Sequence, residues 1–445
     1  MKNSLQHIII RNFTTESGIQ YENIQLSYQL FGKALGKSPV VLVNHALTGN
    51  SDVAGKKGWW SSIIGLDKTI NTNSYTVLAF NIPGNGFDGF LIENYKSFIA
   101  RDVARIFLLG LKKLNIEQLF ALIGGSLGGG IAWEMVALNN KLTRHFIPVA
   151  TDWKSTDWLI ANCQIQEQFL VNSNNPVHDA RMHAMLCYRT PESFKKRFQR
   201  SKKENTDIFN VESWLLHHGK KLQERYQLSS YKLMNQLLKT IDVTRNNDDN
   251  IDILDKIEAD IHIIGVDSDL FFTAEENRQT HKKLALTKEN VTYNEINSVH
   301  GHDAFLIEYD QLQKIIEPIF NKNYKQQKMK VLKFGGKSLA NGKGIENALE
   351  IIKSKYHKKD NFTVVVSARG NTTNDLETIL EKAVVKKEYK SDFEKFKLYQ
   401  QKPNPTVDFS AEFEKLESFF EGVFLLGDYS KKIRDEVLAQ GELLS

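Results

Sequence analysis

One short segment places a serine among glycines in a pattern typical of a covalent nucleophile. Residues 124–129 read Gly-Gly-Ser-Leu-Gly-Gly, which contains the spacing G-x-S-x-G around Ser126. An apolar stretch with strand character precedes the segment directly, and a helical pattern follows it. Glycines allow the tight strand-to-helix turn that exposes the serine hydroxyl, and the following amide, that of Leu127, can then point toward an oxyanion. The structural alternative is a glycine turn that serves close helix packing.

A serine nucleophile needs a base and an orienting carboxylate, in the chain order Ser, then Asp or Glu, then His. Asp269 follows one predicted strand and His302 follows the next. Asp267 and His300 lie two residues away from them and are rivals, because a sequence does not say which of two neighbouring side chains turns inward. The pattern therefore predicts a serine triad with two of its positions contested.

The elements that must position these residues alternate along the first 150 residues. Two helices are expected, at residues 98–114 and 127–138. Six strands are expected, at residues 7–13, 24–31, 40–43, 75–80, 119–123 and 145–149. Two strands joined directly and then strand-helix alternation predict a mostly parallel α/β sheet with an antiparallel start.

A helical, polar stretch interrupts this alternation between residues 151 and 250. Strands and helices resume at residues 261–266, 274–286, 291–296 and 304–320. We therefore expect a core built from residues 1–150 and 251–320, with a helical lid at residues 151–250. A polar linker at residues 321–328 should separate this unit from a segment at residues 329–445, where a new strand-glycine-helix pattern begins.

Composition excludes several classes of protein. The chain has 445 residues, of which 41% are hydrophobic and 25% charged, as in ordinary globular proteins. A net charge of +5 is too small to indicate nucleic-acid binding without a basic motif, and no apolar run approaches the roughly 20 residues of a membrane span. No metal-ligand spacing links the histidines. Two cysteines, Cys163 and Cys187, are expected to be buried thiols in a reducing, cytoplasmic compartment.

Several separate blocks together resemble the homoserine O-acetyltransferases of the α/β-hydrolase fold. They are His45-Ala46-Leu47-Thr48-Gly49, Gly58-Trp59-Trp60, the segment 124–129, Ala180-Arg181-Met182 with Tyr188-Arg189, Ser268-Asp269 and the segment 301–306. The resemblance implies acetyl transfer from acetyl-CoA, as co-substrate, to the hydroxyl of L-homoserine, in methionine biosynthesis, with no bound cofactor. It also implies a homodimer that pairs through the helical lid.

The same resemblance assigns roles to single residues. It makes Ser126 the nucleophile, Asp269 the triad acid and His302 the base, with Leu47 and Leu127 supplying the oxyanion-hole amides. Arg181 would hold the homoserine carboxylate through its guanidinium fork, and Asp303 would receive the α-amino group. Without the resemblance, Arg181 would be read as a solvated charge on a lid helix.

One segment departs from the family pattern and keeps alternatives open. Residues 81–89 read Asn-Ile-Pro-Gly-Asn-Gly-Phe-Asp-Gly where the family usually has a glycine- and serine-rich turn near the acyl pocket. The alternatives are a homoserine or serine O-succinyltransferase, a carboxylesterase of the same fold, and a binding module without catalysis. An intact triad disfavours the last of these, and Arg181 with Asp303 disfavours the esterase.

Beyond residue 328 the chain resembles the amino-terminal part of an aspartate kinase. The matching blocks are the segments 333–340, 364–368, 373–376 and 441–445. By this resemblance Lys333, Gly335 and Gly336 would bind phosphate, since such turns present a lysine and open backbone amides to phosphate groups. Lys337 stands where a threonine is usual, and the family's nucleotide-binding half does not follow. We expect this segment to be inactive as a kinase.

Overall fold

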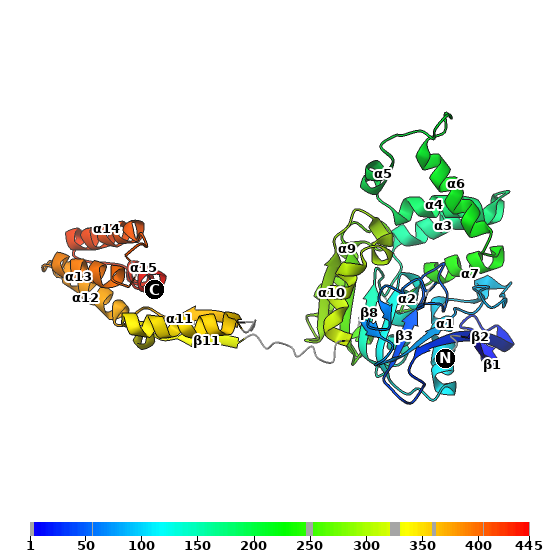
Figure 1. Cartoon of the computed structure of the whole chain (residues 1–445), viewed down its shortest axis with the longest axis horizontal. Coiled ribbons are helices and arrows are strands. Elements are labelled where there is room, and N and C mark those ends of the chain that lie inside the picture. The colour runs from blue at the N-terminus through cyan, green and yellow to red at the C-terminus, as the bar shows by residue number, and fades with distance from the viewer. Residues whose placement is uncertain are drawn as a thin grey trace. The chain divides into compact units, whose positions relative to one another are not determined.

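The chain forms two compact units, Met1–Lys322 and Asn323–Ser445 (Figure 1). This computed structural model describes residues 4–55, 57–245, 252–320, 330–357, 362–403 and 405–444. The expected linker at residues 321–328 lies outside the described residues, as do the last residues of the expected lid.

Unit 1 is built on an eight-stranded sheet with the order β1-β2-β6-β3-β7-β8-β9-β10. The two β1-β2 and β2-β6 pairings are antiparallel and the remaining pairings are parallel. The strands are β1 (Gln6–Thr14), β2 (Gln20–Gly32), β3 (Val40–Asn44), β6 (Thr76–Phe80), β7 (Leu119–Gly125), β8 (Thr143–Val149), β9 (Asp260–Val266) and β10 (Val291–Ile296). The predicted mostly parallel sheet with an antiparallel start is therefore confirmed.

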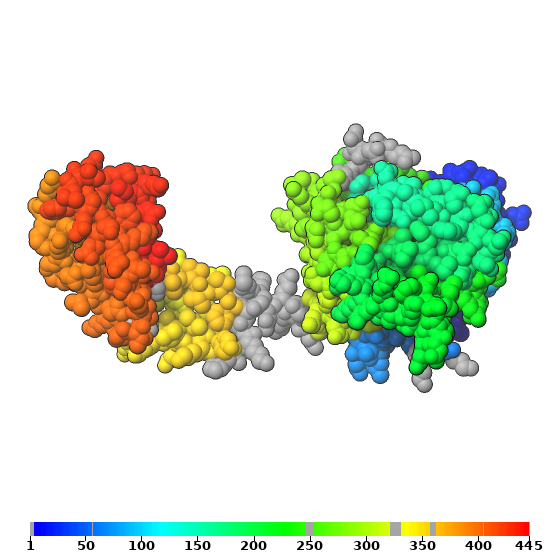
Figure 2. Space-filling model, turned by 90° about the horizontal axis from the view of Figure 1, so that it is seen from above, coloured from blue at the N-terminus to red at the C-terminus, as the bar shows by residue number. Residues whose placement is uncertain are grey.

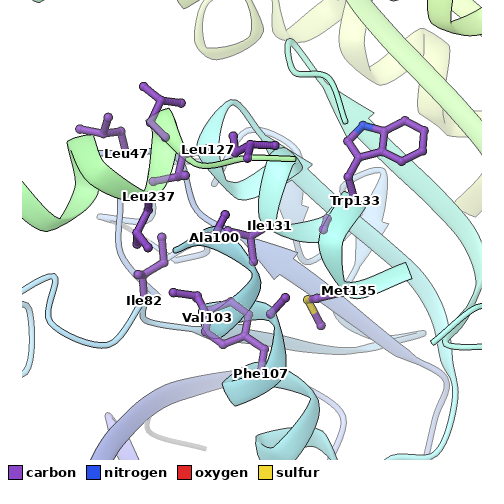
Figure 3. Packing of buried hydrophobic residues seen from close by; sticks show 14 of the residues in the cluster. Leu47, Ile82, Ala100, Val103, Phe107, Leu127, Ile131, Trp133, Met135 and Leu237 are labelled. Carbon is purple, nitrogen blue, oxygen red and sulfur yellow. The ribbon is translucent and has the colours of Figure 1, made fainter. Parts of the chain in front are cut away.

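Helices cover both faces of this sheet, which explains why β3 and β6 are buried along their whole length. Helices α1 (Ala100–Lys113), α2 (Leu127–Leu138) and α9 (Ala274–Leu284) contribute to the apolar cluster on one face, part of which Figure 3 shows. Helix α10 (Tyr309–Phe320) and the short strands β4 (Ile64–Gly65) and β5 (Ile70–Asn71) contribute to the second cluster on the other face.

The segment between β8 and β9 forms a helical lid, as the loss of strand pattern predicts. Its helices are α3 (Asp157–Asn172), α4 (Pro176–Tyr188), α5 (Pro191–Phe198), α6 (Asn210–Gln223), α7 (Leu228–Lys239) and the short α8 (Asp252–Asp255). In Figure 2, unit 1 is seen from the side of these helices, and their cyan to green atoms occupy much of that face. The lid thus covers the carboxyl ends of the parallel strands, where β7 meets Ser126.

The helix expected at residues 304–320 is wrong in its first turns. Residues Gly301–Leu306 form a 3-10 turn, η2, and α10 begins after it at Tyr309. Gly301 takes a positive φ of 65°, and Tyr188 backbone lies 3.0 Å from where its Cβ would be. A continuous helix is broken here because the turn must carry His302 toward the end of the sheet. The 3-10 turn η1 (Tyr95–Ser97), like strands β4 and β5, was also not expected from the sequence.

Unit 2 begins with the predicted strand-glycine-helix pattern. Strands β11 (Lys330–Phe334) and β12 (Phe362–Val366) pair in parallel, joined through the 3-10 turn η3 (Gly336–Leu339) and helix α11 (Gly342–His357). Four helices follow and share a core: α12 (Thr372–Val384), α13 (Lys390–Gln401), α14 (Ser410–Leu426) and α15 (Lys431–Leu443). Across the described ranges of both units, no helix has the length and apolarity that crossing a membrane requires.

Backbone packs directly on backbone where α2 meets the sheet. A Cβ on Gly128 would lie 2.4 Å from the carbonyl oxygen of Asn44 and 2.5 Å from that of His45. A Cβ on Gly124 would lie 2.5 Å from the carbonyl oxygen of Gly128. Because these neighbours are backbone atoms, they cannot rotate away, so this close approach requires glycine. The approach brings the loop after β3 against the start of α2.

We predict that Gly128→Ala lowers the free energy of unfolding of unit 1 by about 2 kcal/mol, because the added methyl forces the two backbones apart. All six tryptophans belong to unit 1, so urea unfolding followed by tryptophan fluorescence measures this unit alone. Gly65→Ala, also in unit 1, is the control, since its Cβ position in β4 meets only the flexible side chain of Lys68, at 3.3 Å. Equal midpoints for Gly128→Ala and the wild-type chain would contradict the prediction.

Candidate active site

Ser126 stands on a strained turn between β7 and α2. Its backbone has φ 54° and ψ −126°, a conformation that residues with a Cβ rarely adopt. Such strain costs on the order of 1–3 kcal/mol and persists where the surrounding structure enforces it. The amide of Ser126 donates to Val149 of β8 at 2.9 Å, which fixes the turn to the sheet. The turn therefore holds the hydroxyl in one place at the end of the strands.

Two hydrogen bonds join Ser126, His302 and Asp269. The Ser126 hydroxyl lies 2.8 Å from His302 Nε2, and His302 Nδ1 lies 2.7 Å from Asp269 Oδ2. With the proton on Nδ1, the ring donates to the carboxylate and accepts from the serine. All three residues are at most 4% exposed. This geometry lets His302 remove the serine proton while Asp269 holds the ring orientation.

The protein fixes the carboxylate and surrounds the imidazole with aromatic rings. Asp269 Oδ1 accepts hydrogen bonds from the amides of Phe271 and Phe272 at 2.7 and 3.0 Å. The rings of Phe271, Phe272, Tyr188 and Phe305 have centroids 5.2–5.8 Å from that of His302. These rings pack around the imidazole, which is 3% exposed.

Both rivals of the triad residues have other partners. Asp267 Oδ1 accepts from the amide of Ser298 at 2.9 Å. His300 Nδ1 lies 3.0 Å from the hydroxyl of Ser193 on lid helix α5. The structure thus places Asp269 and His302, and neither Asp267 nor His300, at the serine.

Leu47 and Leu127 lie on the two backbone segments that Gly128 brings together. Leu127 is the first residue of α2, so its amide has no partner within the helix. Leu47 lies in the loop after β3, and both side chains belong to the same apolar cluster, as Figure 3 shows. Amides at these two positions can converge on an oxyanion formed at Ser126.

His45 anchors the loop that carries Leu47. Its Nδ1 donates to the carbonyl of Ala46 at 2.8 Å, and its Nε2 accepts from the amide of Ile82 at 3.0 Å. The ring is 1% exposed, and this burial lowers the pKa of His45 to about 4. His45 is therefore a neutral imidazole that joins the loop at residues 45–49 to the one at residues 81–89.

The loop at residues 81–89, which departs from the family pattern, packs against the lid. Gly84 has φ 86°, and its Cβ position lies 2.6 Å from Leu233 of α7. Gly86 has φ 77°, and its Cβ position lies 2.8 Å from the Ser230 hydroxyl. The glycines of this loop are thus required both by the backbone conformation and by contact with α7.

Arg181 and Asp303 lie near the triad histidine by different routes. The guanidinium of Arg181, on α4, lies 5.5 Å from the ring centroid of Tyr188, which packs on His302. Asp303 directly follows His302, and its Oδ2 accepts from Arg189 Nε at 2.9 Å. The Arg189 ion pair was not foreseen, because residues 114 positions apart in the sequence give no signal of pairing.

A small cavity lies beside the triad under the lid. Leu47, Tyr188 and Phe271 form the side next to the candidate catalytic residues. Lid residues form the rest of its lining: Asn162, Cys163, Gln166, Ala184, Cys187, Tyr231, Asn235 and Leu238. Among these described residues there is no lysine or arginine.

Cys163 is buried as expected, whereas Cys187 is only partly buried. Burial raises the pKa of the Cys163 thiol to about 12 and that of the Cys187 thiol to about 11.

In unit 2, Lys333 lies on β11, and Gly335 follows the strand. A Cβ on Gly336 would lie 2.4 Å from the carbonyl oxygen of Ala368, while nothing lies within 4 Å of that on Gly335. Lys333 is exposed. Gly336 therefore allows two backbone segments to pack closely, whereas the space beside Gly335 is open.

The fold and site together define the class of protein. A mostly parallel sheet, a serine on a strand-to-helix turn and a His-Asp pair after the next strands are the features of an α/β-hydrolase with a serine triad. Residues 39–169 match the family model described as the alpha/beta hydrolase fold, and residues 328–445 match that of the amino acid kinase family.

Comparison with curated proteins gives the particular family. The chain is 32% identical over 336 residues to the homoserine O-acetyltransferase of Cyclobacterium marinum, covering 69% of this chain and 92% of that protein. It is 31% identical to that of Chloroherpeton thalassium, covering 68% and 85%. The chain belongs to the homoserine O-acetyltransferase family, with an amino acid kinase segment at its carboxyl end.

Solved structures share the fold. The homoserine O-acetyltransferase of Staphylococcus aureus matches with a TM-score of 0.62 and 24% identity, covering 72% of this chain and 96% of that one. Esterase E22 matches with a TM-score of 0.64 and 19% identity, covering 72% and 100%. The fold alone therefore does not distinguish transfer to an amino acid from ester hydrolysis, and the site must do so.

We predict that His45 makes unit 1 less stable in acid. Between pH 6.5, its ordinary pKa, and its folded pKa of about 4, the unfolded chain binds a proton that the folded chain does not. Stability present above pH 6.5 is therefore lost as the pH falls, by about 2 kcal/mol from this residue between pH 7 and pH 5. Urea unfolding followed by tryptophan fluorescence measures the effect.

The control is the same titration on His45→Gln, which cannot gain this proton. Its unfolding free energy should change less between pH 7 and pH 5 than that of the wild-type chain. Parallel pH dependences in the two chains would show that His45 does not contribute.

Proposed function

We propose that the chain is a homoserine O-acetyltransferase that works through an acyl-Ser126 intermediate. The observation that carries this proposal is the hydrogen-bonded set of Ser126, His302 and Asp269. Asp303 directly follows His302, and Arg181 lies over the ring of Tyr188, which packs on His302. The triad supports acyl transfer, and the charged neighbours support an amino acid as acceptor. Membership in the homoserine O-acetyltransferase family agrees with both.

In the first step, Ser126 attacks the thioester carbon of acetyl-CoA while His302 Nε2 takes the serine proton. The carbon–sulfur bond breaks, and His302 gives the proton to the departing CoA sulfur. The amides of Leu47 and Leu127 stabilise the oxyanion, each by about 3 kcal/mol in the transition state. The product of this step is acetyl-Ser126 and free CoA.

In the second step, the γ-hydroxyl of homoserine gives its proton to His302 and attacks the acyl carbon. The bond to Ser126 breaks, and the serine oxygen recovers the proton from His302. Water can compete for the same ester, so the site must exclude it. The aromatic rings around His302 and the lid helices support this requirement.

Family membership supports acetyl over succinyl as the transferred group, since the relatives named above are homoserine O-acetyltransferases. A succinyl group carries a carboxylate, and burying a charge without a cationic partner is costly. The small cavity that Leu47 helps to line offers no cation among its described residues, which agrees with an uncharged acyl group, although Ser126 is not part of that lining. We therefore propose acetyl-CoA as the co-substrate, with no bound cofactor.

Arg181 and Asp303 are the proposed homoserine contacts. A guanidinium fork can hold the α-carboxylate through two hydrogen bonds. Asp303 uses Oδ2 for Arg189, and we propose that its carboxylate also receives the α-ammonium group. Arg189 then orients Asp303 toward the substrate.

We also propose an oligomeric state and a cellular compartment for this chain. The lid exposes large apolar side chains, which support a homodimer paired through it: Trp158, Ile165, Val171, Leu186 and Leu216. Two thiols, both in the described part of the chain, support a reducing cytoplasmic compartment. The substrates are small molecules, and neither nucleic acid nor membrane takes part.

The decisive test is thiol release from acetyl-CoA and from succinyl-CoA, with homoserine, with serine and with no acceptor. We expect CoA release that is at least tenfold faster with acetyl-CoA plus homoserine than in any other combination. Equal release with and without homoserine would favour an esterase instead.

We predict that Ser126→Ala abolishes transfer while leaving the fold intact, because no other atom can hold the acyl group. Intact-protein mass spectrometry should show one acetyl group on the wild-type chain when homoserine is withheld and none on the variant. An unchanged circular dichroism spectrum controls for folding. Turnover by the variant within tenfold of wild type would contradict a covalent route through Ser126.

We predict that Arg181→Met and Asp303→Asn impair the second step more than the first. Loss of one partner of a desolvated charge pair costs about 2–5 kcal/mol, so the KM for homoserine should rise well over tenfold. The burst of CoA release should change much less, since acetyl-CoA acylates Ser126 without homoserine. Equal loss of the burst and of homoserine use would make these residues structural.

We propose that unit 2 of this chain has no aspartate kinase activity. Phosphoryl transfer requires the nucleotide and acceptor to be held together in one site. In the described residues of unit 2, the paired strands β11 and β12 leave Val331, Val365 and Val366 at least 40% exposed. This sheet therefore does not form the enclosed site that holding two substrates requires. Aspartate-dependent ADP release from ATP, lost in Lys333→Ala, would overturn this proposal; the expected result is no release from either chain.

A further inference from the structure

The lid is hydrogen-bonded to the loop that carries the candidate oxyanion amide. We call residues 45–49 the oxyanion loop and residues 224–227, between α6 and α7, the lid turn. In the lid turn, the Tyr226 hydroxyl donates to the carbonyl of Leu47 at 3.0 Å. Its neighbour Arg225 donates from Nη2 to the carbonyl of Thr48 at 3.2 Å. Two consecutive lid residues thus bind two consecutive carbonyls of this loop.

We propose that Tyr226 is a positioning residue that fixes the amide of Leu47 in the oxyanion hole. Arg225 supplies a second hydrogen bond to the same loop, which is exposed to solvent. This inference rests on the proposed acyl transfer through Ser126 and assigns the lid a part in it. Tyr226 touches neither substrate nor the reacting atoms in this account. It acts through the backbone of Leu47.

The oxyanion loop is held on both sides of Leu47. On the amino-terminal side, His45 donates to Ala46 and accepts from Ile82. On the carboxyl-terminal side, Tyr226 holds the carbonyl of Leu47 itself. With both flanking peptide groups held, rotation about the backbone of Leu47 is restricted, and its amide keeps one direction. Such preorganised donors give an oxyanion hole its effect, because no reorganisation is needed during the reaction.

Burial shields the hydrogen bond between the Tyr226 hydroxyl and the Leu47 carbonyl from solvent. Tyr226 is 8% exposed, and its ring packs edge-on against Tyr231 of α7 with centroids 5.9 Å apart. Burial raises the pKa of Tyr226 well above its ordinary range, so the hydroxyl remains a donor at any assay pH. Arg225 is exposed and its bond to Thr48 is open to water, so it should contribute less than Tyr226.

The hydrogen bonds on both sides of Leu47 connect the oxyanion loop to the lid. Helix α7 begins directly after the lid turn and packs on Gly84 and Gly86. Those glycines belong to the loop whose Ile82 amide binds His45. The lid turn reaches Leu47 directly, and α7 reaches it through His45. The seating of the lid therefore determines the direction of the Leu47 amide, and both acylation and transfer depend on it.

The test compares Tyr226→Phe with Tyr75→Phe. Tyr75 is a matched control, because its buried hydroxyl donates to a backbone carbonyl, that of Phe320, at 2.9 Å. It belongs to the apolar cluster on the other face of the sheet. Each variant loses one hydroxyl and one hydrogen bond. Acylation of Ser126 is followed with acetyl-CoA and, separately, with p-nitrophenyl acetate, and transfer is followed with homoserine.

We expect Tyr226→Phe to slow acylation by both donors about tenfold relative to Tyr75→Phe, with the KM for homoserine unchanged within twofold. Arg225→Gln should slow acylation less than tenfold in the same direction. Equal acylation rates in Tyr226→Phe and Tyr75→Phe would overturn the proposal. So would a loss that appears wholly as a higher KM for homoserine.

The two donors separate this inference from the proposed function. If the wild-type chain reacts with p-nitrophenyl acetate but does not acetylate homoserine, the proposed substrate is wrong. The comparison of the two phenylalanine variants with the ester probe then still decides the role of Tyr226.

Discussion

The contact of Gly128 with the carbonyls of Asn44 and His45 is the constraint on which the site depends. It brings the start of α2 against the loop after β3 with no side chain between them. Ser126, the proposed nucleophile, stands two residues before Gly128 on the first segment, and Leu47 stands on the second. The two halves of an oxyanion hole can therefore face one serine. A methyl group at this position would separate them.

The remaining parts of unit 1 hold the titratable side chains around this contact in defined orientations. Asp269 is held by two backbone amides, so its carboxylate keeps one orientation toward His302. His45 stays neutral and serves as a link between loops rather than as a base. The lid adds Arg181 above Tyr188 and holds the oxyanion loop through the lid turn. We propose that a fold shared with esterases is in this way adapted to an amino-acid acceptor.

The sequence predicted the elements whose patterns are local, and missed those that depend on distant contacts. The strand-serine-helix order at residues 119–138 is visible in the chain because apolar periodicity and glycines coincide there. The choice between Asp267 and Asp269 was not visible, since it depends on which side chain meets an imidazole 33 residues away. The Arg189 pairing with Asp303 and the Tyr226 bond to Leu47 were missed for the same reason. The break before α10 arises because η2 must place His302 at the sheet end, which overrides the helical pattern.

The central claim is that the acyl group rests on Ser126 between two separate half-reactions. The most direct measurement is isotope exchange, in which the chain is mixed with acetyl-CoA and labelled free CoA without homoserine. A covalent intermediate predicts that label enters acetyl-CoA, because free CoA can attack acetyl-Ser126 and reverse the first step. Ser126→Ala should show no exchange. Exchange that requires homoserine would contradict the account, since acetyl transfer would then pass directly from CoA to the amino acid.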